Sequence, residues 1–420
     1  MSELKVLVVG ASIAGPMTAY WLAKTGAKVT VIERFPSLRT NGQSIDIRTS
    51  GVTIMRMIPG MEAAVRAKAT PIEGINFVHE DGRIYGTLKA TGNPDQQSLV
   101  SEYEIFRGDL AKVLFDLTKD NEKINYIFGE QVASMQQNET EDGPIRVEFA
   151  NGTPTSEYDL VVACDGSTSR TRALALGCSV RTHIKPTDSW AAYFNIKQNL
   201  LEGSNMGHGY SAVGGRFLAL GTDPSGVCRA TLMCHQPRGL HDATSFHEAS
   251  KKGNDALKQF VAQHYKGAGW KTDEILKGML EADDFYASES VQVKLPSPYK
   301  GRFALVGDAG YAPGPTGTGT TLAMTGAYVL AGEVGKHKGD LAAGLKGYEE
   351  RMKPIIADMQ KIPPFIWAIL APQTAWGVWL RRNILTFILW TGILNFLQKY
   401  FGSAFASSDK YRLPDYEWVA

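Results

Sequence analysis

The N-terminal segment constrains the fold of this chain more than any other part of the sequence. The run Leu4–Val9 is short, apolar and β-branched, as in a strand buried on both faces of a parallel sheet. The residues GASIAG, Gly10–Gly15, follow it, and the apolar spacing from there to Lys24 is helical. A second apolar run, Lys28–Ile32, ends at Glu33. Strand, tight turn, helix and strand in this order predict the start of a doubly wound α/β domain.

The same turn predicts a binding site for a dinucleotide. Gly10 permits the tight turn, Gly15 lets the helix pack closely on the strand, and the free N–H groups at the helix start can bind a pyrophosphate. Glu33 lies about twenty residues beyond the glycines, where an acid binds an adenosine ribose hydroxyl. Ser12 replaces the middle glycine of the usual pattern with another small residue. The alternative is a strand-to-helix turn without a ligand, but strand, helix and acid all favour the dinucleotide.

Composition argues against several other classes of protein. The 420 residues carry a net charge of +1, so no strongly basic surface for nucleic acid is expected. The four cysteines have no Cys-x-x-Cys spacing, which argues against a zinc site, an iron–sulfur cluster or a disulfide framework. The first residues enter an apolar run without the basic region and cleavage site of a signal peptide. We therefore expect a cytoplasmic protein without a metal site.

Three further segments are candidates for ligand contacts. Arg107 stands at the entrance of a helix predicted over 109–117, and a buried-strand run ends at Asp165, followed by GSTSRTR. The run Arg302–Val306 predicts a strand that leads into GDAGYAPGPTGTGTT, with Asp308 as its acid. A strand that ends in Asp308 places a carboxylate at the carboxyl edge of the sheet, where ligands of open α/β folds bind. The glycines after it let backbone lie against a flat ring.

These motifs resemble those of the group A flavoprotein monooxygenases, typified by para-hydroxybenzoate hydroxylase. The glycine turn with its acid, the helix-entry arginine, CDGSTSRTR and GDAGYAPGP occur in the family's order over about the first 350 residues. Within the family, the sequence GTTLAMTGAYVLAGE and the residues 45–48 and 413–416 look similar to tetracycline-inactivating flavin monooxygenases and relatives acting on fungal polyketides. The resemblance implies FAD as cofactor and NADPH or NADH as co-substrate.

The resemblance also implies which residues bind the cofactor. They are Gly10, Ser12, Gly15, Glu33, Arg34, Arg48, Arg107, Asp165, Asp308, Gly317, Gly319 and Thr320. Arg34 would lie beside the adenine or its ribose, Arg107 would reach the ribitol and pyrophosphate, and Asp308 would accept from a ribitol hydroxyl. Asp165 belongs to a motif associated with both FAD and NADPH. Arg48 would contact FAD phosphate or NADPH, or else lie on the surface.

A second group of segments predicts an antiparallel sheet inserted into the nucleotide domain. Residues 75–85 alternate and contain Asp81-Gly82, a hairpin signal, and several strand-like runs lie between 178 and 293. In the family such a sheet forms the roof of the substrate site over the flavin. It could equally be a dimerisation surface, so both a monomer and a homodimer are compatible with the sequence.

The predicted sheet contains the candidates for substrate binding. The polar residues that could bind a substrate or accept a phenolic proton are His208, Tyr210, Arg216 and His235. An ordinary surface or hydrogen-bonded role is the alternative for each. Period-two alternation places Tyr193 with Asn195 on one strand face, and Thr231 with His235 on one face of another strand. It does not indicate which face meets the flavin.

The segments together predict a Rossmann-like FAD-binding domain, an inserted substrate-binding sheet and a C-terminal helical segment. The FAD-binding domain comprises 1–73, 96–177 and 294–353, the substrate domain 74–95 and 178–293, and the C-terminal helices 354–420.

The C-terminal segment contains an apolar run over 383–397, which is shorter than the roughly 20 residues a membrane span needs. Arg381, Arg382 and Lys399 flank the run. The flanks leave two alternatives, a helix packed against both domains or a helix lying in a membrane interface.

The resemblance implies an FAD-dependent, NAD(P)H-using monooxygenase that hydroxylates an electron-rich aromatic or enolic small molecule, such as a polyketide, through a flavin C4a-hydroperoxide. The flavin would supply the chemistry, and the protein would supply orientation, electrostatics and exclusion of water. Baeyer–Villiger and epoxidising enzymes share the motifs and stay as alternatives. A non-catalytic flavin-binding protein is the alternative of another class. A flavin halogenase is disfavoured because the sequence has no Gly-Trp-x-Trp-x-Ile segment.

Overall fold

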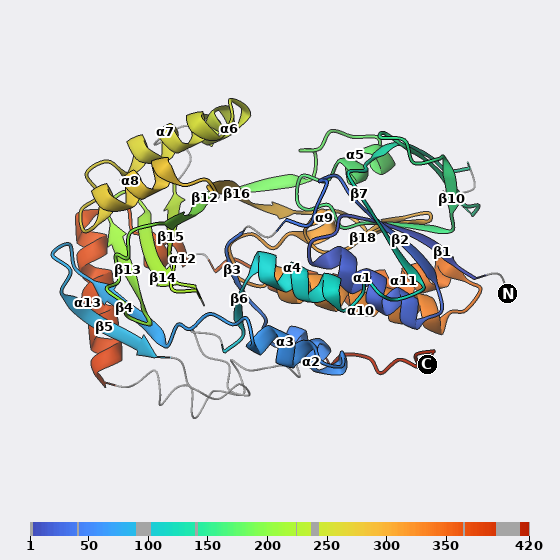
Figure 1. Ribbon diagram of the computed structural model, residues 1–420, viewed down its shortest axis with the longest axis horizontal. Helices are drawn as coiled ribbons and strands as arrows, with labels where there is room; N and C mark the ends of the chain where they lie inside the picture. Colours follow the sequence, from blue (N-terminus) through green and yellow to red (C-terminus); the bar gives the residue numbers. More distant parts are fainter. Residues whose placement is uncertain are drawn as a thin grey trace.

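The computed structural model describes residues 3–39, 42–89, 102–138, 142–223, 225–236, 243–363, 366–391 and 412–419. These residues form two large sheets that lie side by side, each with helices packed on it (Figure 1). The chain passes between the two halves several times, so neither sheet comes from one continuous segment. The expected boundary at 95/96 and the end of the apolar run, 392–397, lie outside the described residues.

The first sheet has the doubly wound arrangement that the N-terminal sequence predicts. Its strands, in spatial order, are β17 (Tyr299–Lys300), β18 (Phe303–Leu305), β11 (Leu160–Ala163), β1 (Lys5–Val9), β2 (Lys28–Glu33) and β7 (Ile124–Phe128). All pairs are parallel except that of β17 with β18. The central strand β1 is buried from Val6 to Val9, because the sheet is covered on both faces.

Helices cover one face of this sheet and a smaller sheet covers the other. The helices that share an apolar core with it are α1 (Ala14–Lys24), α2 (Ser50–Met57), α3 (Met61–Arg66), α4 (Arg107–Asp116), α10 (Gly319–Lys336) and α11 (Leu341–Met359). On the opposite face, Leu7 and Leu305 belong to a core with β9 (Ile145–Phe149) and β10 (Ser156–Tyr158), which form a three-stranded sheet with β8 (Val132–Gln136). This small sheet is not among the elements predicted from the sequence.

The second sheet has seven strands and includes the predicted hairpin. In spatial order they are β16 (Tyr286–Val293), β12 (Ile184–Ile196), β15 (Cys228–His235), β14 (Arg216–Thr222), β13 (Met206–Ala212), β4 (Gly74–Val78) and β5 (Ile84–Lys89). The turn between β4 and β5 uses Gly82 with a φ of 84°. The β4–β13 pair is parallel, so the sheet is mixed rather than antiparallel throughout. The hairpin comes from an earlier part of the chain, so no short turn fixes its direction relative to β13.

One face of the second sheet is covered by helices, and the other faces the first domain except over β5 and β13, where α13 (Ala375–Thr391) packs on it. The covering helices are α6 (Ala243–Lys251), α7 (Asn254–Tyr265) and α8 (Thr272–Glu281). Alternate residues of the strands, including Leu218, Leu232 and Trp190, form the core beneath them. The residues between these point to the opposite face, which is therefore available for a site between the two halves of the molecule.

The C-terminal segment continues as helices beyond the first domain. Helix α11 runs through Pro354, so the expected boundary at 353/354 falls inside a helix. A proline removes one helical hydrogen bond, but Met352 and Ile355 on either side of it are buried and hold the helix against the core. Two more helices follow, α12 (Ile366–Leu370) and α13 (Ala375–Thr391). None of the helices in the described ranges is long and apolar enough to cross a bilayer.

The last described residues return to the first domain, near the N-terminal end of the molecule (Figure 1). The ring of Tyr416 occupies the space above Gly332 of α10, where any side chain would overlap it. Its hydroxyl donates to Glu333 Oε1 at 2.7 Å. The backbone of Val419 donates to the carbonyl oxygen of Lys24 at 2.8 Å, so the tail joins α10 to α1.

One buried arginine fixes two loops of the first domain to each other. Arg172 is completely buried, and its guanidinium donates to the carbonyl oxygens of Ala309 at 2.7 Å, Ser167 at 2.8 Å and Val180 at 2.9 Å. Ser167 follows β11, and Ala309 follows β18. The arginine therefore positions the DG loop relative to the GD loop.

We expect Arg172→Met to lower the free energy of unfolding by about 3 kcal/mol, because the buried carbonyl of Ala309 and two partly buried carbonyls lose their donor. Urea denaturation followed by circular dichroism measures the change. The control is Arg170→Met, an exposed arginine two residues earlier in the same helix, for which a change within about 0.5 kcal/mol is expected. Equal stabilities of the two variants would contradict this role of Arg172.

Candidate functional site

Backbone segments meet so closely at the carboxyl edge of the first sheet that glycine is required there. A side chain on Gly15 would overlap the carbonyl oxygen of Gly10. Gly10 has a φ of 107°, and a Cβ on it would lie 2.7 Å from the carbonyl oxygen of Cys164, at the end of β11. The turn after β1 is therefore packed against both its own helix and the neighbouring strand, with Ser12 half-buried in it.

The carboxylate of Glu33 lies next to this turn and contacts its backbone. It accepts hydrogen bonds from the backbone N–H of Ala11 at 3.0 Å and of Phe35 at 3.2 Å. A carboxylate has further lone pairs, so it can accept from another donor such as a ribose hydroxyl. Next to it, the guanidinium groups of Arg34 and Arg39 lie 4.7 Å and 4.5 Å from the centroid of the Phe35 ring. Arg34 is exposed next to Glu33.

Gly307, at the end of β18, is the point where α1 and α10 converge. It has a φ of 68°, and a Cβ on it would lie 3.0 Å from the Cβ of Ala14 and 3.3 Å from the Cβ of Ala323. Asp308 follows and is exposed. The dense protein around Asp308 raises its pKa, and the positive charge of Arg107 opposes that shift. Asp308, after β18, and Arg107, at the start of α4, are therefore close enough for the charge of the arginine to act on the acid.

The start of α10 is an open helix N-terminus beside Asp308. The helix begins at Gly319, where a Cβ would lie 3.7 Å from Asp308 Oδ1. Thr318 precedes the helix without a side-chain cap, and no acid lies in the first turn. Gly317 has a φ of 74° and no atom within 4 Å of an added Cβ. Free N–H groups and the positive end of the helix dipole are thus available to an electron-rich group.

Two of the predicted cofactor-binding residues use their carboxylate or guanidinium within the protein. Asp165 accepts from the hydroxyl of Ser169, from the backbone N–H of Thr171 at 3.2 Å and from its hydroxyl at 2.9 Å. Arg48 forms an ion pair with Asp46 at 2.9 Å. These contacts organise the two loops from within.

The backbone of Arg48 is also fixed to α10. The hydroxyl of Thr321 donates to the carbonyl oxygen of Arg48 at 3.0 Å and accepts from its N–H at 3.2 Å. The loop that precedes Arg48 is thereby held next to the start of α10, where Thr320 is also buried.

Tyr311, three residues after Asp308, does not face the site. It is buried, its hydroxyl lies 3.1 Å from that of Tyr348, and its ring fills the space over Gly326. Tyr348 in turn donates to the carbonyl oxygen of Leu305 at 2.7 Å. The tyrosine pair therefore anchors the GD loop to the core of the domain.

A cavity of about 150 Å³ lies between the two halves of the molecule. One wall is the ribbon of β3 (Ser44–Asp46) and β6 (Glu104–Phe106), in which Ser44 pairs with Phe106 and Asp46 with Glu104. The other wall is the free face of the seven-stranded sheet, where Tyr193, Thr231 and Ala219 form one cross-strand row. Tyr286 pairs with Tyr193 and extends the row.

The ribbon places an acid in the cavity wall. Burial and the nearby carboxylate of Asp46 raise the pKa of Glu104, while Ser44 and Arg48 oppose the shift. Glu104 lies three residues before Arg107, so the same short segment contributes to the cavity and to the edge where the residues predicted to bind the cofactor lie.

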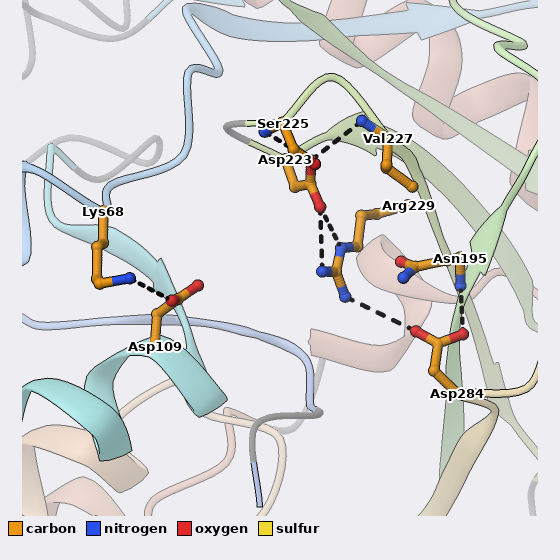
Figure 2. Close-up of polar contacts among 8 residues, drawn as sticks. All are labelled: Lys68, Asp109, Asn195, Asp223, Ser225, Val227, Arg229 and Asp284. Atoms are coloured by element: carbon orange, nitrogen blue, oxygen red, sulfur yellow. Dashed lines mark hydrogen bonds and ion pairs between the residues drawn. The ribbon is translucent and has the colours of Figure 1, made fainter. Parts of the chain in front are cut away.

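A charged cluster borders the cavity, whose lining includes Arg229 and Asp284, and Figure 2 shows the contacts within the cluster. The guanidinium of Arg229 lies 3.1 Å from Asp223 Oδ2, 3.9 Å from Asp284 Oδ2 and 4.2 Å from the centroid of the Phe106 ring. Asp284 also accepts from the backbone N–H of Asn195 at 3.0 Å. Phe106 directly precedes Arg107, the first residue of α4. The contact of Arg229 with Phe106 therefore connects the seven-stranded sheet to α4.

A second ion pair in the same view holds the start of α4 (Figure 2). Lys68, after α3, lies 2.9 Å from Asp109 in the first turn of α4. It fixes the helix that begins at Arg107 to the helical layer of the first domain.

The structure does not bring the four polar candidates together in the cavity. Tyr210 donates to the carbonyl oxygen of Ala268 at 2.9 Å, and Arg216 donates to that of Val213 at 2.8 Å. Both residues lie on the helix-covered face, since Tyr210 pairs with the core residue Leu218 and Arg216 with Cys234.

The two histidines are also apart from each other. His208 borders the cavity, but its strand position places its ring on the helix-covered face, 6.3 Å from the ring of Trp270. His235 lies at the far end of β15 and stacks on Trp367 with 4.0 Å between ring centroids. Burial lowers the pKa of both histidines. Arg229 does line the cavity. It lies two residues before Thr231 on the same strand, so period-two alternation could have placed it on the same face as Thr231.

Comparisons with known proteins agree with this architecture. The family described as FAD binding domain matches residues 3–361. The chain is 34% identical over 412 residues to FAD-dependent monooxygenase asL4 of Sarocladium schorii, covering 92% of this chain and 93% of that protein. It is 33% identical to Monooxygenase CTB7 of Cercospora beticola, covering 99% and 98%. The crystal structure of tetracycline destructase Tet(55) is 29% identical, with a TM-score of 0.76 and 99% of each chain covered.

The fold and the site thus define a flavoprotein with an inserted β-sheet domain. The chain belongs to the FAD binding domain family and is an FAD-dependent monooxygenase.

The charged cluster generates a prediction about pH. Burial by itself would raise the pKa of Asp223, but hydrogen bonds from Ser225, Val227 and Arg229 outweigh burial and lower it. A lowered pKa stabilises the folded protein above the unfolded-state value of about 3.9, and this contribution is lost as the pH falls through the folded-state value. We expect Asp223→Asn to lower the melting temperature near neutral pH, and the difference from wild type to shrink as the pH falls below about 4.

Thermal unfolding across this pH range measures the effect. Asp120→Asn, at an exposed acid, serves as the control and should match the wild type at every pH. A difference between Asp223→Asn and wild type that stays constant with pH would contradict the account.

Proposed function

We propose that the protein uses NAD(P)H and O₂ to hydroxylate an electron-rich aromatic or enolic small molecule of the polyketide kind. The observation that supports this most is the cavity between the β3–β6 ribbon and the seven-stranded sheet, because it adjoins the edge where the FAD-binding motifs gather. Tetracycline destructases, among the similar structures, act by their name on tetracycline. A planar phenol or enol fits between a sheet wall that contains Tyr193 and Tyr286 and a ribbon wall that contains Phe106.

The residues at the carboxyl edge fit FAD. Gly10 and Gly15 have no side chain, and none would fit at either position. The backbone N–H groups at the start of α1 can therefore approach the pyrophosphate. Glu33 has acceptor capacity left for a ribose hydroxyl. The exposed Asp308 would accept from the ribitol, and the open start of α10 from Gly317 to Thr320 would face the pyrimidine edge. When bound, FAD supplies hydride acceptance from NAD(P)H and activation of oxygen.

The chain's own side chains would position and activate the substrate. Glu104 is placed to accept the proton of a phenol or enol, which makes the neighbouring carbon more nucleophilic. The raised pKa of this acid brings it closer to that of such a proton donor. Tyr193 and Phe106 would hold the ring from opposite walls. The sheet and the ribbon together exclude water from the reacting carbon.

The cofactor assignment predicts that Asp308→Ala weakens FAD binding by about tenfold or more, because a hydrogen bond to a charged group is lost. Titration of the apoprotein with FAD, followed by flavin fluorescence, measures the dissociation constant. Asp120→Ala, at an exposed acid, is the control. Unchanged flavin content in Asp308→Ala would show that this acid does not contact the cofactor.

If the substrate binds in this cavity, a side chain that fills the cavity should abolish the stimulation of NADPH oxidation by substrate. We expect wild-type protein to consume NADPH faster with one or more members of a panel of phenols, anthraquinones and tetracyclines. Ala219→Phe, in the cavity row, should keep its FAD and its basal NADPH oxidation but lose the stimulation, whereas Ala219→Ser should retain it. Stimulation that survives Ala219→Phe would place the substrate elsewhere. Product masses and structures then distinguish hydroxylation from oxygen insertion or epoxidation.

A further inference from the structure

Helix α13 packs on the cavity side of the seven-stranded sheet along one of its faces. Leu389 lies against Gly86 of β5, and Thr386 donates to the carbonyl oxygen of Tyr85 at 3.2 Å. Arg381 donates to the hydroxyl of Ser211 on β13. These contacts fix the rotation of the helix, so that its opposite face points away from the protein (Figure 1).

The outward face of α13 carries four large aromatic side chains. The exposed fractions are 67% for Trp376, 50% for Trp379, 59% for Phe387 and 83% for Trp390. At about 100° per residue, these positions fall within a sector of about 80° on the helix surface. We call this set the aromatic stripe. Among the described residues, no tryptophan outside α13 is classed as exposed.

Single exposed apolar residues need no explanation, but several large ones gathered on one helix face mark an interaction site. Nothing in the described part of the chain covers the aromatic stripe, since α13 contains no buried residue. The outward row is therefore available to a partner, and its chemistry identifies the kind of partner.

Two features favour a lipid surface as that partner. Tryptophan is the residue that concentrates at the boundary between headgroups and acyl chains, because its ring is apolar and its N–H is polar. Helix α13 contains no acidic residue. Such a segment meets no repulsion from anionic headgroups.

We propose that the aromatic stripe of α13 binds the surface of an anionic phospholipid bilayer, with the helix lying parallel to the membrane plane. The tryptophans would insert at the level of the headgroups, while the opposite face of the helix stays packed on the sheet. The proposal concerns attachment to the surface and does not depend on the reaction that the enzyme catalyses.

The test is co-sedimentation of purified holoprotein with two kinds of vesicle, one of phosphatidylcholine with phosphatidylserine and one of phosphatidylcholine alone. We expect binding to the mixed vesicles, with a blue shift of tryptophan fluorescence and weakening at high salt. The combined variant Trp376→Ser, Trp379→Ser, Phe387→Ser and Trp390→Ser should bind at least about tenfold more weakly. FAD content and the melting temperature report that this variant is folded.

The matched control is the double variant Leu174→Ser and Leu280→Ser, which removes exposed apolar side chains from other surfaces and should bind like wild type. The proposal is overturned if wild-type protein stays in the supernatant with both kinds of vesicle, or if the combined variant binds as well as wild type. Equal binding to both vesicle types would also overturn it. So would a wild-type dimer that dissociates in the combined variant, because the stripe would then be a contact between two copies.

Discussion

The structure depends on close backbone contact at one edge of the first sheet. The turn after β1 touches the end of β11 at Gly10 and its own helix at Gly15, and the end of β18 touches both α1 and α10 at Gly307. No Cβ fits at the first two positions without overlap, so glycine is a packing requirement as well as a conformational one. Because three separate parts of the chain converge there, their helix starts and acids face one common space. An extended dinucleotide can then contact all of them at once.

The cavity follows from how the second sheet is inserted. β12 and β16 pair along their length and carry the chain out of the first domain and back into it, which holds the seven-stranded sheet over the β3–β6 ribbon. The contact of Arg229 with Phe106 then joins the two walls directly beside the start of α4. With Asp223 and Asp284 on either side of it, Arg229 is not a free cation in this cavity. A carboxylate substrate would have to compete with both, whereas a neutral phenol or enol would not.

Local sequence patterns predicted the parts of the site that short segments determine. The glycine turn, Glu33, the helix entry at Arg107 and the strand end before Asp308 each depend on fewer than about ten consecutive residues, and the structure has the predicted strand, turn or helix at each. The parallel β4–β13 pair was missed because it depends on a contact between distant segments. The small sheet β8–β10 is formed by consecutive strands and was not predicted either. Whether each predicted residue binds FAD stays a prediction.

The substrate side was harder to predict for a definite physical reason. Alternation shows which residues of a strand share a face, but the choice between the two faces depends on which one the helices cover. Helices α7 and α8 cover the face that contains Tyr210, so its polar hydroxyl is satisfied by Ala268 and not by a ligand. The other face contains Gly207, Gly209 and Gly221, and nothing in the sequence around these glycines indicated a cavity. Ile72, from a distant part of the chain, packs over Gly207 and Gly221, and a Cβ on Gly221 would lie 3.0 Å from its Cδ1. A contact of this kind leaves no polar or periodic signal in the sequence, so this wall of the cavity could not be found by looking for polar residues.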